Sequence, residues 1–148
     1  MKIFKDVNGK EWQISITVGT IKRVKDLMDV NLIDAVSTDL IDKMKSDPVF
    51  LCDILYAICK PQADKDGVSD IEFGEGLVGD AIASATDALI GDLVDFFPAS
   101  QRVILRKALA KIEAAEKQMT EMMDQKIDAM MDSEIEKRVR SFTESFGQ

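Results

Sequence analysis

Hydrophobic and polar residues alternate near the amino end of the chain, and from about residue 18 a repeat of three to four residues replaces the alternation. In the alternating part, Trp12, Ile14 and Ile16 share one face of an extended segment. A second short apolar segment begins at Ile3, and the Asn-Gly pair between the two segments favours a type I′ turn. The pattern predicts a β-hairpin that packs on helices, because an isolated two-stranded hairpin is only marginally stable in water.

Helical periodicity predicts the elements that follow. Asp47-Pro48 is a strong start signal, since an N-cap residue precedes a proline at the first helical position. The helix that begins there and runs to residue 59 is apolar on almost every side, so we expect it to be the central buried helix. A loop is expected from Lys60-Pro61 to Gly67-Val68. Other helices are expected at about residues 18–28, 38–46 and 69–96, the last with a break near Gly74 and Gly76.

The last part of the chain is expected to be one long helix. Neither glycine nor proline occurs from residue 99 to Gly147. A helix of about 46 residues is roughly 70 Å long at 1.5 Å per residue, which is more than a body of this size can cover. The predicted fold class is α+β and mainly helical, with an amino-terminal β-hairpin, about four body helices and a long carboxy-terminal helix. We expect two parts, a hairpin plus helical body in residues 1–98 and a long Met-rich amphipathic helix or arm in residues 99–148.

Charge and composition narrow the function classes. The chain of 148 residues has no histidine, two cysteines and a net charge of −8, and residues 61–100 carry the whole excess of acidic groups. This balance argues against nucleic-acid binding and against docking on an anionic membrane, and it makes the middle third a candidate face for a basic partner. With no apolar run of membrane-spanning length and no signal-peptide pattern, we expect a soluble cytoplasmic protein. Histidine is the commonest general base in enzymes, and the chain has none. We therefore expect that the protein is not an enzyme.

Two motifs suggest metal chemistry, and neither has a complete ligand set. Asp64-Lys65-Asp66-Gly67 is similar to the middle of a calcium loop, but Gln62 and Phe73 occupy the first and twelfth ligand positions. Cys52 and Cys59 lie about two helical turns, roughly 10 Å, apart, which is too far for a disulfide. We therefore expect an acidic surface loop, two small apolar side chains, and no catalytic, metal-binding or cofactor-binding residues and no cofactor.

The many acidic side chains raise the question of a catalytic pair of carboxylates. Asp80, Asp87 and Asp95 share one face of a predicted helix, which favours a solvated acidic face over paired-carboxylate catalysis. An enzyme with carboxylate chemistry stays the least favoured of the hypotheses.

Methionine is the most informative residue type. Five of the eight methionines fall between residues 119 and 131, and they extend an apolar stripe along the carboxy-terminal helix. Methionine is unbranched and polarizable, so a Met-rich face adapts to imperfectly matched partner helices. Residues 101–148 carry nine basic and nine acidic groups, so recognition is expected to be apolar. The alternative is packing on the body or on a second copy of the chain. The candidate partner-binding residues are Met119, Met122, Met123, Ile127, Met130, Met131 and Ile135.

The first 34 residues contain, in order, a strand, an Asn-Gly turn, a strand with Trp12, a helix with Lys22-Arg23 and the segment Val30–Asp34. This order resembles the tail assembly chaperones of long-tailed bacteriophages. The segment Leu55–Gln62 and the pairs Ser69-Asp70 and Phe73-Gly74 also look like uncharacterised phage and prophage proteins, so the resemblance covers roughly residues 1–97. The Met-rich arm lies outside the resemblance.

This resemblance implies a non-enzymatic chaperone of the host cell cytoplasm that binds the aggregation-prone helical tape measure protein during tail assembly. The expected partner is therefore the tape measure or another tail protein, and the exposed stripe also predicts a homo-oligomer. The alternative is a structural virion subunit, such as a tail completion or connector protein.

Overall fold

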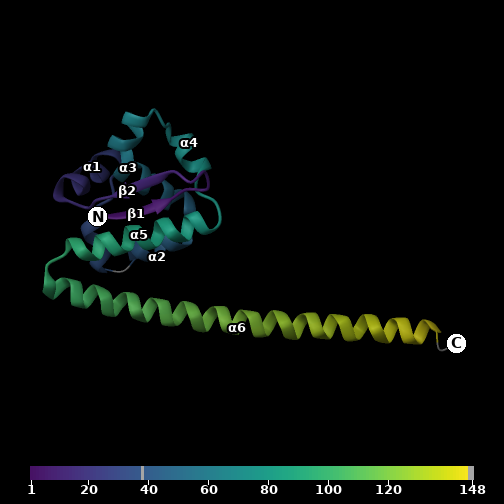
Figure 1. The fold of residues 1–148 in the computed structure, drawn as a ribbon. Coiled ribbons are helices and arrows are strands. Elements are labelled where there is room, and N and C mark those ends of the chain that lie inside the picture. The colour runs from purple at the N-terminus through teal and green to yellow at the C-terminus, as the bar shows by residue number, and fades with distance from the viewer. Residues whose placement is uncertain (38, 147–148) are drawn as a thin grey trace. The chain divides into compact units, whose positions relative to one another are not determined.

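The structure is a computed structural model that describes residues 1–37 and 39–146 (Figure 1). It confirms the predicted fold class, an antiparallel hairpin followed by helices, of which the last is very long. Residue 38, the expected start of one helix, and the last two residues of the expected arm lie outside the described residues. In chain order the elements are β1 (Lys2–Lys5), β2 (Glu11–Ile14), α1 (Val18–Met28), the 3-10 helix η1 (Leu32–Ser37), α2 (Asp39–Ser46), α3 (Pro48–Asp66), α4 (Asp70–Glu75), α5 (Asp80–Phe96) and α6 (Ala99–Phe146).

The chain divides into two compact units, Met1–Arg106 and Lys107–Gln148. The boundary lies inside α6, so this helix begins in the first unit and forms the described part of the second. The first unit contains the hairpin, the 3-10 helix and α1 to α5. α4 and α5 are separate helices, which confirms the break expected near Gly74 and Gly76.

The hairpin turn differs from the predicted type I′ turn. Only Gly9 in the turn has a positive φ, at 79°, whereas both central residues of a type I′ turn need one. The Asp6 N–H donates to the Lys10 carbonyl and the Gly9 N–H donates to the Asp6 carbonyl, which closes a three-residue loop. The reason is the Asp6 carboxylate, which accepts hydrogen bonds from the backbone N–H groups of Asn8 and Lys10 and so stabilises this longer loop.

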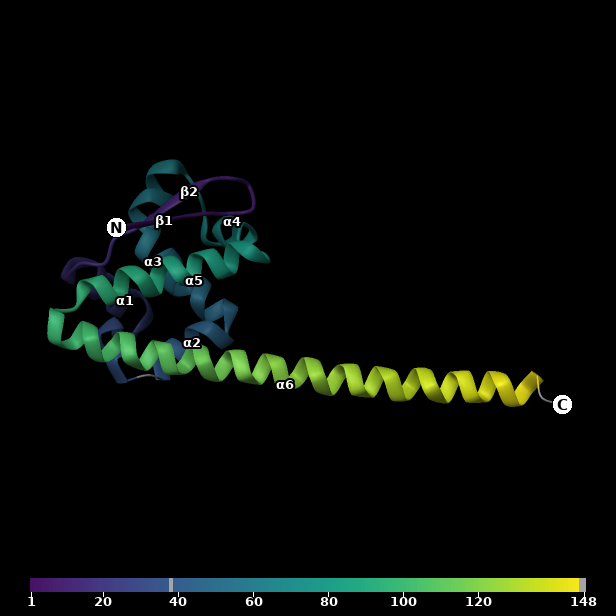
Figure 2. The same cartoon turned by 60° about the horizontal axis from the view of Figure 1, so that its bottom comes forward.

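One face of the hairpin lies in the core of the first unit. Phe4, Trp12 and Ile14 are all buried, and Trp12 packs edge-on against Phe73 of α4 with 4.8 Å between ring centroids. α5 runs alongside β1, and α3 packs against β2, so the hairpin packs on helices as expected (Figures 1 and 2). The hairpin is therefore held between two helices.

A buried carboxylate fastens the hairpin to α5. Asp92 is only 4% exposed, accepts the Ile16 N–H at 2.6 Å and forms an ion pair with the Met1 amino group at 2.8 Å. A buried charge is costly unless it is paired and hydrogen-bonded, and Asp92 is both. The sequence does not single out Asp92, because only Asp80, Asp87 and Asp95 fall on the predicted acidic face of this helix.

α3 is longer than predicted. Its N-cap is Asp47, as expected, but the helix continues through Pro61 to Asp66 and ends at Gly67 with a φ of 69°. The expected loop over residues 60–68 is therefore wrong for most of its length. Pro61 has no N–H to donate to the Ala57 carbonyl four residues earlier, a defect that usually breaks a helix.

Arg23 of α1 repairs this defect. Its Nη1 lies 3.4 Å from the Ala57 carbonyl oxygen and 3.1 Å from the Ile58 carbonyl oxygen, within hydrogen-bonding distance of both. A donor from another helix thus replaces the missing backbone donor, and α3 passes through the proline.

Candidate partner-binding surface

α6 carries the residues that the sequence assigns to partner binding. The helix has no internal glycine or proline, and Leu105 near its start is buried within the first unit. Every residue from 113 to 145 is exposed. This segment is the green-to-yellow part of α6 in Figure 1. Most of the second unit therefore carries exposed side chains.

All seven predicted residues are exposed, with fractions from 49% for Ile127 to 69% for Met122. Large apolar side chains that are scattered singly need no explanation, but a contiguous exposed set marks an interaction site. We call this set the Met-rich surface, and its members are Met119, Met122, Met123, Ile127, Met130, Met131 and Ile135.

The Met-rich surface contains a regular row. Met119, Met123, Ile127, Met131 and Ile135 follow one another at intervals of four residues, and we call them the apolar row. Residues at this spacing form a ridge on a helix, and such ridges fit the grooves of a second helix. The spacing exceeds the 3.5-residue repeat of a left-handed coiled coil, so the row winds around α6 instead of forming a heptad seam.

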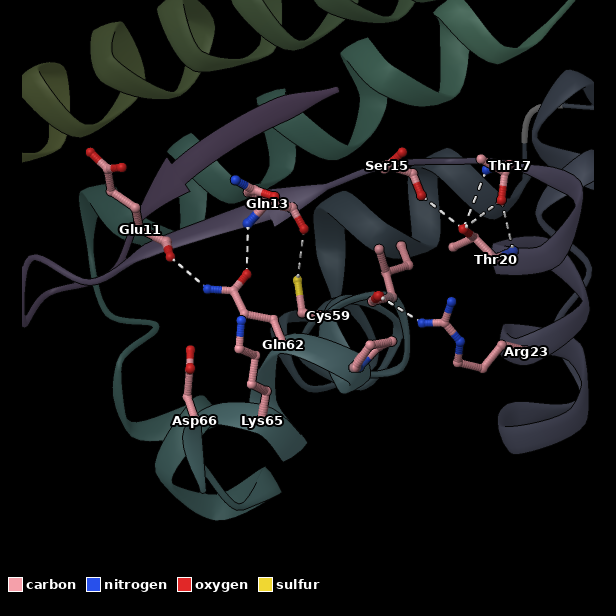
Figure 3. A pocket seen from close by; sticks show the side chains of 12 residues that line it. Glu11, Gln13, Ser15, Thr17, Thr20, Arg23, Cys59, Gln62, Lys65 and Asp66 are labelled. Carbon is pink, nitrogen blue, oxygen red and sulfur yellow. Dashed lines mark hydrogen bonds between the residues drawn. The ribbon is translucent and has the colours of Figure 1, made fainter.

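A groove of about 670 Å³ lies along the free edge of β2 (Figure 3). The Gln62 side-chain oxygen accepts the Gln13 N–H at 3.1 Å, and its nitrogen donates to the Glu11 carbonyl at 2.9 Å. These are the two bonds that a neighbouring strand would make. Gln62 therefore caps a strand edge that would otherwise be open to pairing.

The two cysteines differ in environment. Cys59 is buried beside the groove, and its thiol lies 3.6 Å from the Gln13 carbonyl oxygen. Burial raises the pKa of Cys59 from 9.0 to about 12, although the Arg23 guanidinium acts in the opposite direction. Cys52 is half-buried, and burial followed by the charge of Asp53 raises its pKa as well. Both thiols are free and stay protonated near neutral pH, which suits the predicted role as small apolar side chains.

The acidic motifs lie on the surface of the first unit. Asp80, Asp87 and Asp95 are exposed on α5, and Asp95 lies 3.8 Å from both Lys2 and Arg106. The calcium-like segment forms the end of α3, where Asp64 pairs with Lys60 and Asp66 pairs with Lys10. Each of these two carboxylates faces a lysine, as expected for a surface segment.

Sequence reasoning missed Arg23, Gln62 and Asp92, all of which satisfy backbone groups far away along the chain. Of these three residues, only Arg23 has a role that the sequence could have indicated. A proline inside an apolar helix leaves a carbonyl without its donor four residues earlier, so some other donor has to be found.

No protein-family model matches the chain, and neither does any curated protein or solved structure. Among the helices of residues 1–37 and 39–146, none combines the length and apolar character needed to cross a bilayer. The same residues contain no group of three or more acidic or cysteine side chains placed to hold a metal ion.

Proposed function

We propose that this protein is a non-enzymatic tail assembly chaperone of a long-tailed bacteriophage. In this role it binds the helical tape measure protein in the host cytoplasm and keeps it from aggregating until the tail is assembled. The observation that carries the proposal is the exposure of the whole Met-rich surface on α6. The resemblance of residues 1–97 to such chaperones supplies the class of partner.

The physical chemistry of the surface supports binding to a helical client. A tape measure protein is a long helical polymer with apolar side chains that aggregate when uncovered. Methionine has three rotatable bonds and fits varied apolar partners, so one surface can accept successive segments of such a client. The acidic first unit, which carries the net charge of −8 within residues 61–100, favours solubility of the complex.

The test is co-expression of the chain with the tape measure protein of the same phage. The variant Met122→Gln, Met123→Gln, Met130→Gln and Met131→Gln removes apolar surface while helix propensity stays almost constant. We expect the soluble fraction of the client to fall to near the level seen without the chaperone. The matched control replaces the same four methionines by leucine, which keeps the surface apolar and should keep the client soluble.

Two results would contradict the proposal. One is a glutamine variant that stays folded by circular dichroism and still keeps the client soluble. The other is mass spectrometry of purified particles that finds the protein at a fixed copy number, since a chaperone leaves before maturation. The second result would instead support a structural virion subunit.

A further inference from the structure

The charges along α6 are not evenly mixed, although the helix is neutral as a whole. Residues 119–136 carry six carboxylates and one lysine, a net charge of −5. The flanking segments are basic, with a net charge of +3 in residues 99–118 and +2 in residues 137–146. The Met-rich surface thus lies in the acidic part of the helix, so the balanced charge of residues 101–148 does not describe its surroundings.

The carboxylates are placed as regularly as the apolar side chains. Asp124, Asp128, Asp132 and Glu136 each come one residue after a member of the apolar row, and we call them the acidic row. Neighbouring residues of an α-helix are separated by about 100° around its axis. The acidic row therefore runs beside the apolar row at the same four-residue spacing.

The carboxylates of the acidic row are unpaired in the described structure, unlike a neighbouring glutamate. None of its four carboxylates forms an ion pair within the part of the chain that the structure describes, and all four are exposed. Glu134 lies on a different row and pairs with Arg138 at 4.0 Å. The carboxylates next to the apolar row are thus the ones left for a partner.

We propose that the Met-rich surface binds a basic amphipathic helix. Apolar side chains of this partner pack on the apolar row, and its lysine or arginine side chains lie against the acidic row. A ridge at four-residue spacing fits the groove of a helix, and complementary charge fixes orientation and speeds encounter. This inference rests on the proposed function. It adds that the bound segment of the client is a basic amphipathic helix.

A second copy of this chain fits the surface less well. In a parallel pair in register, the acidic row of one copy lies near that of the other. An antiparallel pair centred on residues 119–136 brings the same two acidic segments together. Like charges at an interface are unfavourable, and the four-residue spacing does not support a heptad coiled coil.

The test uses three synthetic amphipathic peptides that share the same leucine face. The polar face is lysine and arginine in the basic peptide, glutamate in the second peptide, and glutamine and serine in the third. Binding to the full-length protein is measured by fluorescence anisotropy. We expect the basic peptide to bind and the glutamate peptide not to bind. Raising the salt from about 50 mM to about 500 mM should weaken binding of the basic peptide about tenfold, because salt screens exposed charges.

A variant locates the effect on the helix. Asp124→Asn, Asp128→Asn and Asp132→Asn should weaken binding of the basic peptide about tenfold, as expected for the loss of several exposed charge pairs. The matched control makes the same change in net charge on exposed aspartates of the first unit, and it should bind as the wild type does. The control substitutions are Asp26→Asn, Asp29→Asn and Asp42→Asn.

The outcomes separate this inference from the proposed function. If all three peptides bind equally well and the Met-to-Gln variant binds none, the charge inference is overturned and the Met-rich surface stands. A dimer through this surface that the basic peptide cannot displace also overturns the inference, because the occupant is then a second copy. If no peptide binds and the Met-to-Gln variant still protects the client, both proposals fail.

Discussion

Arg23 and Pro61 depend on each other although 37 other residues separate them in the chain. The proline removes the donor for the Ala57 carbonyl, and the guanidinium of Arg23 lies within hydrogen-bonding distance of it, at 3.4 Å. A buried carbonyl without a partner costs roughly 1–3 kcal/mol. The same guanidinium lies near Cys59, so one side chain supports the helix backbone and also alters the electrostatics of a buried thiol.

The first prediction concerns this pair. Arg23→Met keeps the apolar stem and removes the donor, so it should lower the free energy of unfolding by roughly 1–3 kcal/mol. In a Pro61→Ala background the same change should cost less, because the alanine N–H can donate to the Ala57 carbonyl. Urea denaturation of the four proteins gives the coupling energy. Equal costs in the two backgrounds would show that Arg23 does not compensate for the proline.

The second prediction concerns Cys59 and pH. Its pKa is about 12 in the folded protein, whereas the unfolded thiol titrates near 9. Between these values the unfolded state has lost the proton and the folded state has kept it, so stability falls as the pH rises above 9. The slope due to this group approaches about 1.4 kcal/mol per pH unit.

Urea denaturation at pH 8 and at pH 10 measures this effect, and Cys59→Ala is the control. The loss of stability between the two pH values should be smaller in the alanine variant, because the titrating thiol is gone. An equal loss in both proteins would show that other groups, and not Cys59, set the alkaline limit.

At the scale of elements, short sequence signals predicted the features that neighbouring residues in the chain determine, such as helix starts and helix lengths. The start of α3 follows from Asp47-Pro48, and the length of α6 follows from the absence of glycine and proline. The turn type and the end of α3 could not be predicted, because the Asp6 carboxylate and the Arg23 guanidinium decide them. The exposure of the Met-rich surface could not be predicted either. The spacing of apolar residues does not show whether another element of the fold covers them.

The third prediction is that the two parts of the chain differ in local stability. An isolated helix is marginal in water, and the side chains of residues 113–145 of α6 are exposed, so little burial adds to the hydrogen bonds of this segment. At low micromolar concentration, backbone amides of residues 113–145 should exchange with deuterium much faster than those of α3. Hydrogen exchange with mass spectrometry separates the two regions by peptide. Protection of residues 119–135 equal to that of α3 would show that this segment packs on something in the free protein.

At the scale of the whole molecule, two partners compete for the Met-rich surface, a basic helix and a second copy of the chain. The acidic row acts on them with forces of opposite sign. A basic client is attracted by the acidic row, and a second copy of the chain is repelled by it. In the absence of the proposed client the Met-rich surface stays exposed, so we expect weak self-association. The acidic row should keep that association weaker than client binding, so that the client displaces the second copy.

The fourth prediction follows from this competition. Salt screens the repulsion between two acidic rows as well as the attraction of a basic helix. Raising the salt from about 50 mM to about 500 mM should therefore tighten self-association of the free chain while it weakens binding of the basic peptide. Sedimentation velocity over micromolar concentrations measures the first effect, and the Asp124→Asn, Asp128→Asn and Asp132→Asn variant should self-associate at low salt already. A chain that stays monomeric at both salt concentrations would contradict self-association, and a dimer that loosens in salt would show that attraction between opposite charges holds the two copies together.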